Sequence, residues 1–333
     1  MKKYYPVIYG PELRPNLQDF GIQIPLNADR VEQVLQALLQ NPNWQSDRGQ
    51  WLLSINPTPA SFEDLLLAHT EEYVNQLRED PGPALLATYE LIGSDGQYNR
   101  YAPEKAARAL HELRDYQLKH VRALQMAATM ALEFGASYLL GGGLHHAMSF
   151  GGRGFCLVND GVIVLKKMLK KKAIRSAWII DVDAHKGDGT AELTQNQNQI
   201  STLSIHMARG WPIDEGPGPW HLPSTVDIPV ASGEEGQYVA KLEAGLFELL
   251  KHAPGPDIAL VVQGADPYEA DTLPSTQSLK LTLEQMKSRD ELVFKFLKER
   301  NIAQVYVMAG GYGPEVWRAY AQFLNFFLAQ NPA

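Results

Sequence analysis

Residues 177–185 read Ala-Trp-Ile-Ile-Asp-Val-Asp-Ala-His, a short apolar run that ends in two carboxylates and an imidazole. A run of this length predicts a strand, over Ala177–Val182, that is buried on both faces of a sheet. Further apolar runs occur at Ser137–Leu140, Thr202–Ile205, Ile258–Val262 and Val305–Met308, with helical patterns between them at Gly161–Lys172, Glu234–Leu250 and Thr282–Lys298. This alternation predicts an α/β fold with a largely parallel central sheet flanked by helices.

The N-terminal part of the chain is predicted to be mainly helical. Apolar residues recur at helical spacing over residues 31–38, and Ser61 is expected to cap a helix that runs towards Leu77. A long helical region of one or two helices is predicted from Ala102 to about Phe134. Because no internal repeat or linker interrupts the sequence, we expect residues 1–333 to form a single domain.

The charge balance argues against some partners. The chain has 30 Lys and Arg against 38 Asp and Glu, a formal net charge of −8, and its hydrophobic residues make up 45%. The one lysine-rich segment, Lys166–Lys172, lies on a predicted helix, so no direct nucleic-acid binding is expected. A negative charge is compatible with a cationic substrate such as a basic peptide or a polyamine.

The sequence shows no targeting segment. Two lysines follow Met1, but Gly10 and Pro11 interrupt the residues after them, and no apolar run is long enough to cross a membrane. Cys156 is the single cysteine, which rules out an intrachain disulfide and indicates a reducing compartment. We therefore expect a cytoplasmic protein that does not bind membranes.

Polar residues follow four of the predicted strands at the point where each ends. These groups are Gly142-Gly143-Leu144-His145-His146, Asp181-Val182-Asp183-Ala184-His185, Gln263-Gly264-Ala265-Asp266 and Gly310-Gly311-Tyr312. The carboxyl ends of parallel strands meet at one edge of a sheet, where ligands bind. The four groups are therefore expected to form one site.

Asp183, His185 and Asp266 are the candidate metal ligands. Residues i and i+2 of an extended segment point to the same side, so Asp183 and His185 can hold one ion while Asp266 supplies a third ligand. Three protein ligands and an open position are typical of a catalytic zinc site. Each feature alone has a plainer interpretation, such as a turn, a cap or a packed aromatic, but their convergence on one edge favours a metal site.

The motifs resemble those of the histone deacetylase family in order and spacing. They are Gly142–Ala147, Gly154–Asp160, Asp181–Gly189, Gly264–Pro267 and Gly310–Tyr312, with a weaker likeness over Leu66–Leu77. The resemblance implies an arginase-like α/β fold. It also implies one zinc ion per chain on Asp183, His185 and Asp266.

The resemblance further assigns catalytic roles. His145 and His146 would flank the reacting water, and Asp181 and Asp188 would orient them. Tyr312 would donate its hydroxyl to the substrate carbonyl. Amide hydrolysis needs a base for the water, an acid for the amine and a donor for the oxyanion, which these residues can supply. His146 is the expected base, although the residues alone leave the division between the two histidines open.

Weaker assignments concern the substrate and a second ion. Phe155 resembles one aromatic wall of an acyl-lysine tunnel, Trp211 or Met207 would form the opposite wall, and Gly143 would leave room for the acyl group. Members of the family often bind potassium, which would here contact Asp181 and the backbone oxygens of Asp183, His185, Ser204 and Ile205. Lys186 replaces a second histidine of many eukaryotic members, which indicates a prokaryotic-type branch. Asp95 is a candidate for the rim aspartate only by rough position.

The predicted activity is zinc-dependent hydrolysis of an acyl-amide. The substrate would be an acylated lysine in a peptide or protein, or alternatively an acetylated polyamine or another small acyl-amine. An arginase-like ureohydrolase would need further carboxylates for two manganese ions, but Gly187, Gly264 and Ala265 occupy those positions. A non-catalytic acyl-amine-binding protein is the other alternative. The native metal, which iron or cobalt would also suit, and the oligomeric state remain open.

Overall fold

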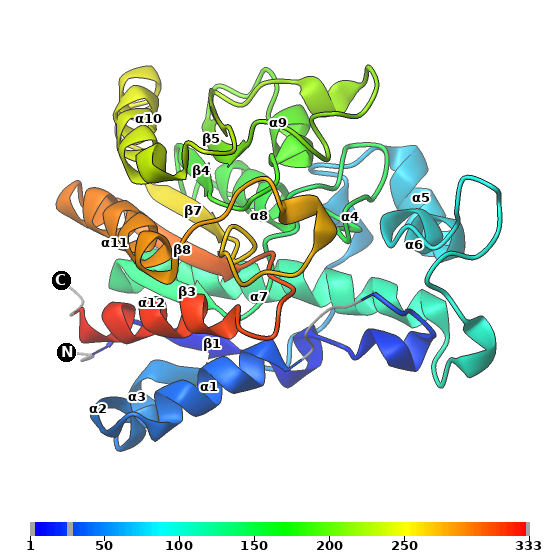
Figure 1. Ribbon diagram of the computed structural model, residues 1–333, viewed down its shortest axis with the longest axis horizontal. Helices are drawn as coiled ribbons and strands as arrows, with labels where there is room; N and C mark the ends of the chain where they lie inside the picture. Colours follow the sequence, from blue (N-terminus) through cyan, green and yellow to red (C-terminus); the bar gives the residue numbers. More distant parts are fainter. Residues whose placement is uncertain (1–3, 25–28, 331–333) are drawn as a thin grey trace.

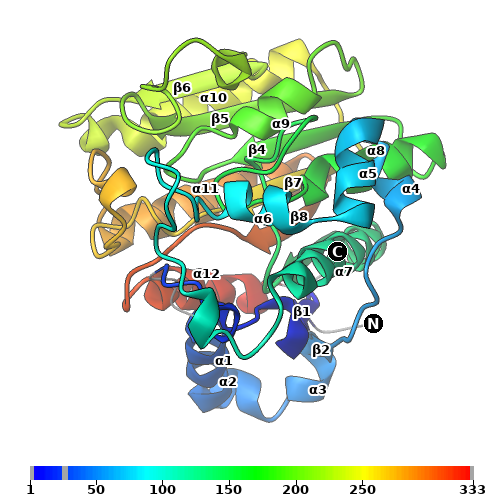
Figure 2. The ribbon, with the colours of Figure 1, turned by 90° about the vertical axis from the view of Figure 1, so that its right-hand side faces the viewer.

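The computed structural model describes residues 4–24 and 29–330, and its eight strands form one parallel sheet (Figure 1). The strand order is β2-β1-β3-β8-β7-β4-β5-β6, which Figure 2 shows from β6 at the top to β2 at the bottom. The strands are β1 (Val7–Tyr9), β2 (Leu52–Ser54), β3 (Ala136–Leu139), β4 (Ala177–Asp181), β5 (Ile200–Met207), β6 (Val226–Val230), β7 (Ile258–Gln263) and β8 (Ala303–Met308). The predicted parallel sheet is confirmed.

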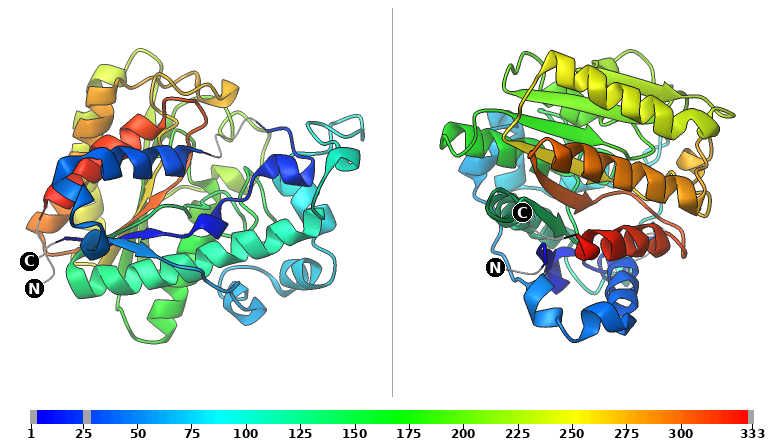
Figure 3. Two further views of the ribbon diagram at one scale, coloured as in Figure 1. Left: turned by 90° about the horizontal axis from the view of Figure 1, so that it is seen from below. Right: turned by 90° about the vertical axis from the view of Figure 1, so that its left-hand side faces the viewer.

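Helices cover both faces of the sheet because its central strands are apolar on both sides. Trp178 and Ile180 of β4 pack into one core, whereas Ala177 and Ile179 pack into the other. The first core lies under α1 (Arg30–Gln40), α10 (Tyr238–His252), α11 (Leu283–Glu299) and α12 (Trp317–Ala329), and the second under α5 (Glu71–Glu79), α7 (Leu113–Phe134) and α8 (Asp160–Lys170). Figure 3 shows α10, α11 and α12 side by side on their face.

The N-terminal helices differ from the prediction at their boundaries. Ser61 does accept a hydrogen bond from the backbone of Asp64, but the helix that it caps, α4 (Phe62–Leu65), is one turn long. Thr70 then caps a second helix, α5. The helical region predicted from Ala102 contains one long α-helix, which begins only at Leu113, and residues 102–112 form two 3-10 turns and irregular chain.

The remaining helices are short. They are α2 (Pro42–Gln45), α3 (Arg48–Trp51), α6 (Gly82–Thr88) and α9 (Asp188–Leu193). Three strands, β1, β2 and β6, were not predicted. β1 and β2 have three residues each, too few for a periodic pattern, and β6 contains Pro229, which suits an edge strand. No helix of the described residues is long and apolar enough to span a membrane.

The strands that carry the four polar groups are neighbours in the sheet. β3, β8, β7 and β4 lie side by side, so the segments after them meet at one edge. Arg289 of α11 fastens two of these segments, because its Nη1 donates to the carbonyl oxygens of Val182 and Gly264, both at 2.9 Å. This buried guanidinium also pairs with Asp290 at 2.7 Å. Arg289 therefore links the segment after β4 to the segment after β7 at the edge of the sheet that holds the site.

Candidate active site

Asp183, His185 and Asp266 converge after β4 and β7. All three are buried, and one potential ligand atom from each lies within 4.8 Å of the others. His185 Nδ1 is 3.2 Å from Asp183 Oδ1 and 3.1 Å from Asp266 Oδ2. Burial raises the pKa of Asp266, and the neighbouring Asp183 raises it further, to about 7. Two carboxylates and one imidazole suit zinc, and a cation between them would offset the carboxylate repulsion, so the residues fit the metal.

Backbone groups hold both carboxylates in place. Gly310 N donates to Asp183 Oδ2 at 3.1 Å, and Ala184 N donates to Asp266 Oδ1 at 3.0 Å. A Cβ atom at Gly264 or Gly310 would lie 2.3 or 2.4 Å from Asp183 Oδ2. Glycine is thus required at both positions for the strand ends to approach the metal ligands.

His145 and His146 form adjacent imidazoles with different carboxylate partners. His145 Nδ1 lies 2.6 Å from Asp181 Oδ2, and His146 Nδ1 lies 2.7 Å from Asp188 Oδ1. The ring centroids are 3.9 Å apart. Burial lowers the pKa of His145, but Asp181 and Asp183 outweigh it and raise this pKa to about 9. Burial and the charge of His145 lower the pKa of His146 to about 3. The two rings therefore favour different protonation states.

Tyr312 lies on the opposite side of the same space. Its backbone N–H donates to Asp271 Oδ2 at 2.6 Å, which fixes the turn after Gly311. Burial raises the pKa of Tyr312 well above its ordinary value, as do the carboxylates of Asp266 and Asp183. The phenol consequently keeps its proton and can act as a hydrogen-bond donor.

Residues 24–326 match the family model described as the histone deacetylase domain. This chain belongs to the histone deacetylase family. "Histone deacetylase 2" of Arabidopsis thaliana is 29% identical over 78% of this chain and 63% of the plant protein, so the chain spans less than two thirds of that relative. "Acetoin utilization protein AcuC" of Staphylococcus aureus is 28% identical over 90% of this chain and 75% of that protein. Family membership supports a hydrolase that acts on amide bonds.

Two solved structures share the fold of this deacetylase-family chain. The HDA15 HD domain has a TM-score of 0.70 and 17% identity, with 99% of this chain and 91% of that chain covered. An HDAC homolog complexed with SAHA has a TM-score of 0.71 and 21% identity, with 99% and 85% covered. The predicted arginase/deacetylase-type α/β fold is thereby confirmed.

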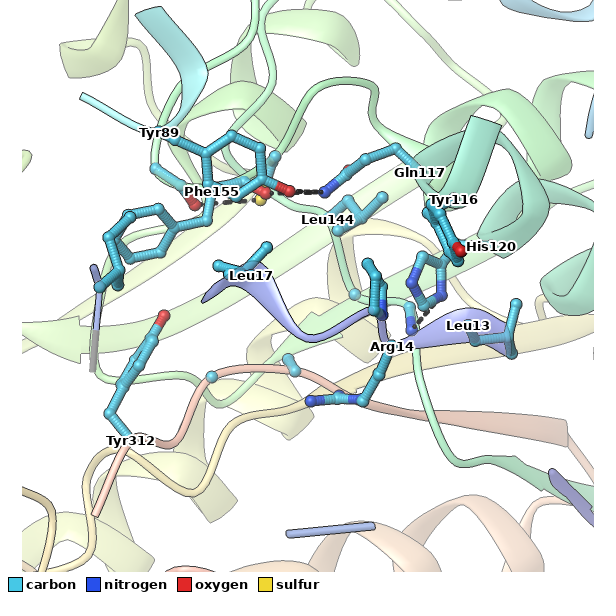
Figure 4. Close-up of a pocket in the computed structure, with 18 of the residues that line it drawn as sticks. Leu13, Arg14, Leu17, Tyr89, Tyr116, Gln117, His120, Leu144, Phe155 and Tyr312 are labelled. Atoms are coloured by element: carbon cyan, nitrogen blue, oxygen red, sulfur yellow. Dashed lines mark hydrogen bonds between the residues drawn. The ribbon is translucent and has the colours of Figure 1, made fainter. Parts of the chain in front are cut away.

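A cavity of about 500 Å³ connects the family motifs (Figure 4). His145, His146, Asp183 and Tyr312 line it, together with Phe155. The Phe155 ring stacks on Tyr89 with centroids 6.1 Å apart, and it lies 6.0 Å from the Tyr312 ring. Phe155 has a φ of 66°, a left-handed conformation that is costly for a bulky residue and that turns the ring into the cavity lining.

Gly143 also lines the cavity, at a φ of 78°. A Cβ there would lie 2.7 Å from Ala309 Cβ. Trp211 and Met207, the two candidates for the opposite tunnel wall, lie in different surroundings. Trp211 is outside the cavity lining but packs on His146, with centroids 4.5 Å apart, whereas Met207 is buried and accepts a hydrogen bond from Ser278 Oγ. Of the two, Trp211 is the one beside the histidine pair.

The residues predicted to hold potassium lie on and after two paired strands. Asp181 of β4 pairs with Ser204 of β5, and Ile205 follows Ser204. Asp181 Oδ1 accepts from Asp183 N at 3.1 Å, and Ser204 Oγ accepts from Gly187 N at 3.3 Å. Asp95 lies on an exposed turn, accepts from Gln97 N and does not line the cavity. Potassium binding and a rim role for Asp95 stay predictions.

Several residues around the site were not predicted. Arg153 Nη1 lies 3.4 Å from Asp188 Oδ2, and its guanidinium stacks against Trp211 and Trp220 at 5.0 and 4.9 Å from their ring centroids. Asp160 accepts backbone hydrogen bonds from Gly143 at 3.0 Å and Leu144 at 2.9 Å, so it shapes the turn before the histidines. The position of Asp160 at the end of the Gly154–Asp160 motif was the available signal, whereas nothing marked Arg153.

Lys186, which replaces a histidine of many eukaryotic family members, is buried and has an acidic partner. Lys186 is 5% exposed, and its Nζ lies 3.2 Å from Asp227 Oδ2 on β6. A buried ammonium needs such a partner. Lys186 therefore joins the segment after β4 to the edge strand β6.

Proposed function

We propose that this chain is a zinc-dependent amidohydrolase that removes an acyl group from an amine nitrogen, with acetyl-lysine in a peptide or protein as its main substrate class. The observation that carries the proposal is the arrangement around one cavity of a buried Asp183/His185/Asp266 group, a carboxylate-bound histidine pair and Tyr312. Residues 1–333 would act as one catalytic domain, and the cytoplasm remains the expected location.

Asp183, His185 and Asp266 would hold one zinc ion, which when bound polarises a carbonyl and lowers the pKa of water. His185 Nδ1 faces both carboxylates, while its Nε2 lies 3.0 Å from Ser275 Oγ. A partner on the far ring nitrogen fixes the orientation of a ligating histidine. Potassium on the Asp181 side of the sheet is part of the same proposal.

The histidine pair would move the two protons of the reaction. We keep His146 as the base that takes the proton of the attacking water, with His145 donating to the departing amine. Asp188 and Asp181 hold these rings by their Nδ1 atoms, which leaves each Nε2 for the reaction. Tyr312 would donate its hydroxyl to the carbonyl oxygen as negative charge develops there. Phe155 and Trp211 would flank the acyl-lysine stem.

The alternative substrate is an acetylated polyamine or another small acyl-amine, because the reaction centre is the same for both. A dimetal ureohydrolase is less well supported. Among the described residues, Asp183, His185 and Asp266 form one group of three that could hold a metal, and no further carboxylate joins it. A purely binding role would leave the histidine pair and Tyr312 without a purpose.

The test compares hydrolysis of an acetyl-lysine peptide and an acetylated polyamine by metal-stripped and zinc-reloaded protein. Activity that returns with zinc would support the proposal, and the ratio of the two rates would rank the substrates. Zinc-loaded protein that hydrolyses neither compound would contradict deacetylation of both classes. Two manganese ions per chain would instead favour the ureohydrolase.

A further inference from the structure

The cavity continues well beyond the reacting groups. Past Tyr312 and Phe155 it is lined by Leu17 and Leu144, and it ends between residues 13–18 and helix α7 (Figure 4). Its volume of about 500 Å³ corresponds to roughly seventeen waters at liquid density. An acetyl group would fill only a small part of this space, so the inner end of the cavity is available to a longer acyl group.

Two guanidinium groups belong to this inner end. Arg14 Nη2 donates to Met308 O at 2.8 Å, and Arg30 donates to Gly311 O and Ala309 O, both at 2.5 Å. These partners are neutral carbonyl oxygens. Among the described residues no carboxylate lies within ion-pair distance of either arginine, and Arg14 Nε is buried without a hydrogen-bond partner. The buried guanidinium of Arg30 and the half-buried guanidinium of Arg14 are thus only partly compensated.

Other charges nearby do not cancel the pair. Burial lowers the pKa of Arg14 to about 9, and the like charge of Arg30 contributes. Glu32 is exposed and accepts a hydrogen bond from the Tyr9 hydroxyl at 3.1 Å, and Asp29 lies at the exposed border of the cavity. His120 accepts a hydrogen bond from Gly142 N on its Nδ1, which requires that nitrogen to be unprotonated. A bound anion would compensate both guanidinium groups.

We propose that the cavity accepts acyl groups that end in a carboxylate, such as succinyl or glutaryl, with this carboxylate bound by Arg14 and Arg30. The inference rests on the proposed amidohydrolase function. The methylene groups would pack on Leu17 and Leu144, which line the same cavity as Arg14 and Arg30. In the reaction the amide C–N bond breaks, the hydroxyl of water joins the acyl carbon, and a proton goes to the nitrogen. The products are a dicarboxylate and an amine.

The test measures kcat/KM on lysine peptides that carry succinyl or glutaryl and on butyryl and pentanoyl peptides, which lack the terminal charge. The wild-type ratio of charged to neutral substrate should exceed one, and Arg14→Gln should lower it by about 10- to 100-fold through loss of a charge-assisted contact. Arg14→Lys, which keeps the charge without the fork, should give an intermediate ratio. Arg175→Gln, at a side chain 87% exposed, is the control and should leave the ratio unchanged.

A wild-type ratio below one, or an unchanged ratio in both Arg14 variants, would overturn the proposal. Inhibition by free acetate and free glutarate is measured as well. Acetate that inhibits as strongly as glutarate would also overturn the proposal, because the arginines would then bind the released acid. If no amide is hydrolysed, the proposed function fails instead, and calorimetry with glutarate on the full chain decides the inference separately. Binding to the wild type that Arg14→Gln abolishes would support the anion site, and no binding would exclude it.

Discussion

The two sides of the cavity are built in different ways. The catalytic wall consists of the segments after β3, β4, β7 and β8, where buried side chains are held by backbone N–H groups and neighbouring strands. The loop wall consists of Leu13–Gln18, Tyr89 and Gly154–Cys156, which lie in mostly irregular segments and are partly exposed. The difference indicates that the sheet positions the reacting groups, whereas the loops determine which substrates enter the cavity.

The largest expected effect is at the catalytic wall. Asp183→Ala removes one of three ligands and should abolish zinc binding and with it hydrolysis. Metal content measured by mass spectrometry checks this, with Glu248→Ala on the exposed face of α10 as a control that retains zinc. Full zinc occupancy in Asp183→Ala would place the metal site elsewhere.

The next largest effect is expected on kcat, at Tyr312, the hydrogen-bond donor opposite the histidine pair. Tyr312→Phe should lower kcat by roughly 100-fold or more, since one oxyanion donor is lost. Steady-state kinetics on the acetyl-lysine peptide checks this, with zinc content measured in parallel to show an intact metal site. Turnover close to that of the wild type would remove Tyr312 from the mechanism.

Acidification should loosen the segment of the loop wall that carries Phe155, because the neutral His69 forms hydrogen bonds on either side of that segment. His69 Nδ1 lies 2.9 Å from Met148 O, its Nε2 accepts from Asn159 N, and burial lowers its pKa to about 4. This pKa is below the unfolded value of about 6.5, so protons favour the unfolded chain, and stability falls as the pH drops from 6.5 towards 4.

A change from pH 7 to pH 5 should therefore lower the free energy of unfolding by roughly 2 kcal/mol through His69 alone. Urea unfolding at both pH values measures the difference, and His69→Gln should show a smaller one. An equal pH dependence in this variant would mean that His69 does not contribute.

The smallest effect is expected where the two walls meet. Arg153 lies beside the second oxygen of Asp188 and between two tryptophans, so Arg153→Met should lower kcat about tenfold, as for other residues that orient catalytic groups. Arg153→Lys should recover part of kcat because it keeps the charge. A change in KM alone would instead make Arg153 a loop-wall residue that contacts substrate.

The sequence predicted the catalytic wall better than it predicted the rest of the cavity. The strands that carry the motifs were predictable because they are short, continuous apolar runs, and the polar residues directly after them had to share one edge. Arg14 and Arg30 were not predictable, since their partners are backbone carbonyls 279 to 294 positions away. The Ser61 cap was read correctly, yet the helix length depended on Thr70, which starts a new helix after one turn. A capping residue thus predicts where a helix begins, whereas tertiary packing decides where it ends.

The position of the single cysteine makes the cavity accessible to chemical labelling. Cys156 is buried, lines the cavity and donates a hydrogen bond from its thiol to Gly154 O, and burial raises the pKa of that thiol. A thiol at this place reacts slowly with alkylating reagents. With no other thiol in the chain, the rate of alkylation becomes a reporter of how often the loops admit a small molecule, and a bound ligand should slow it further.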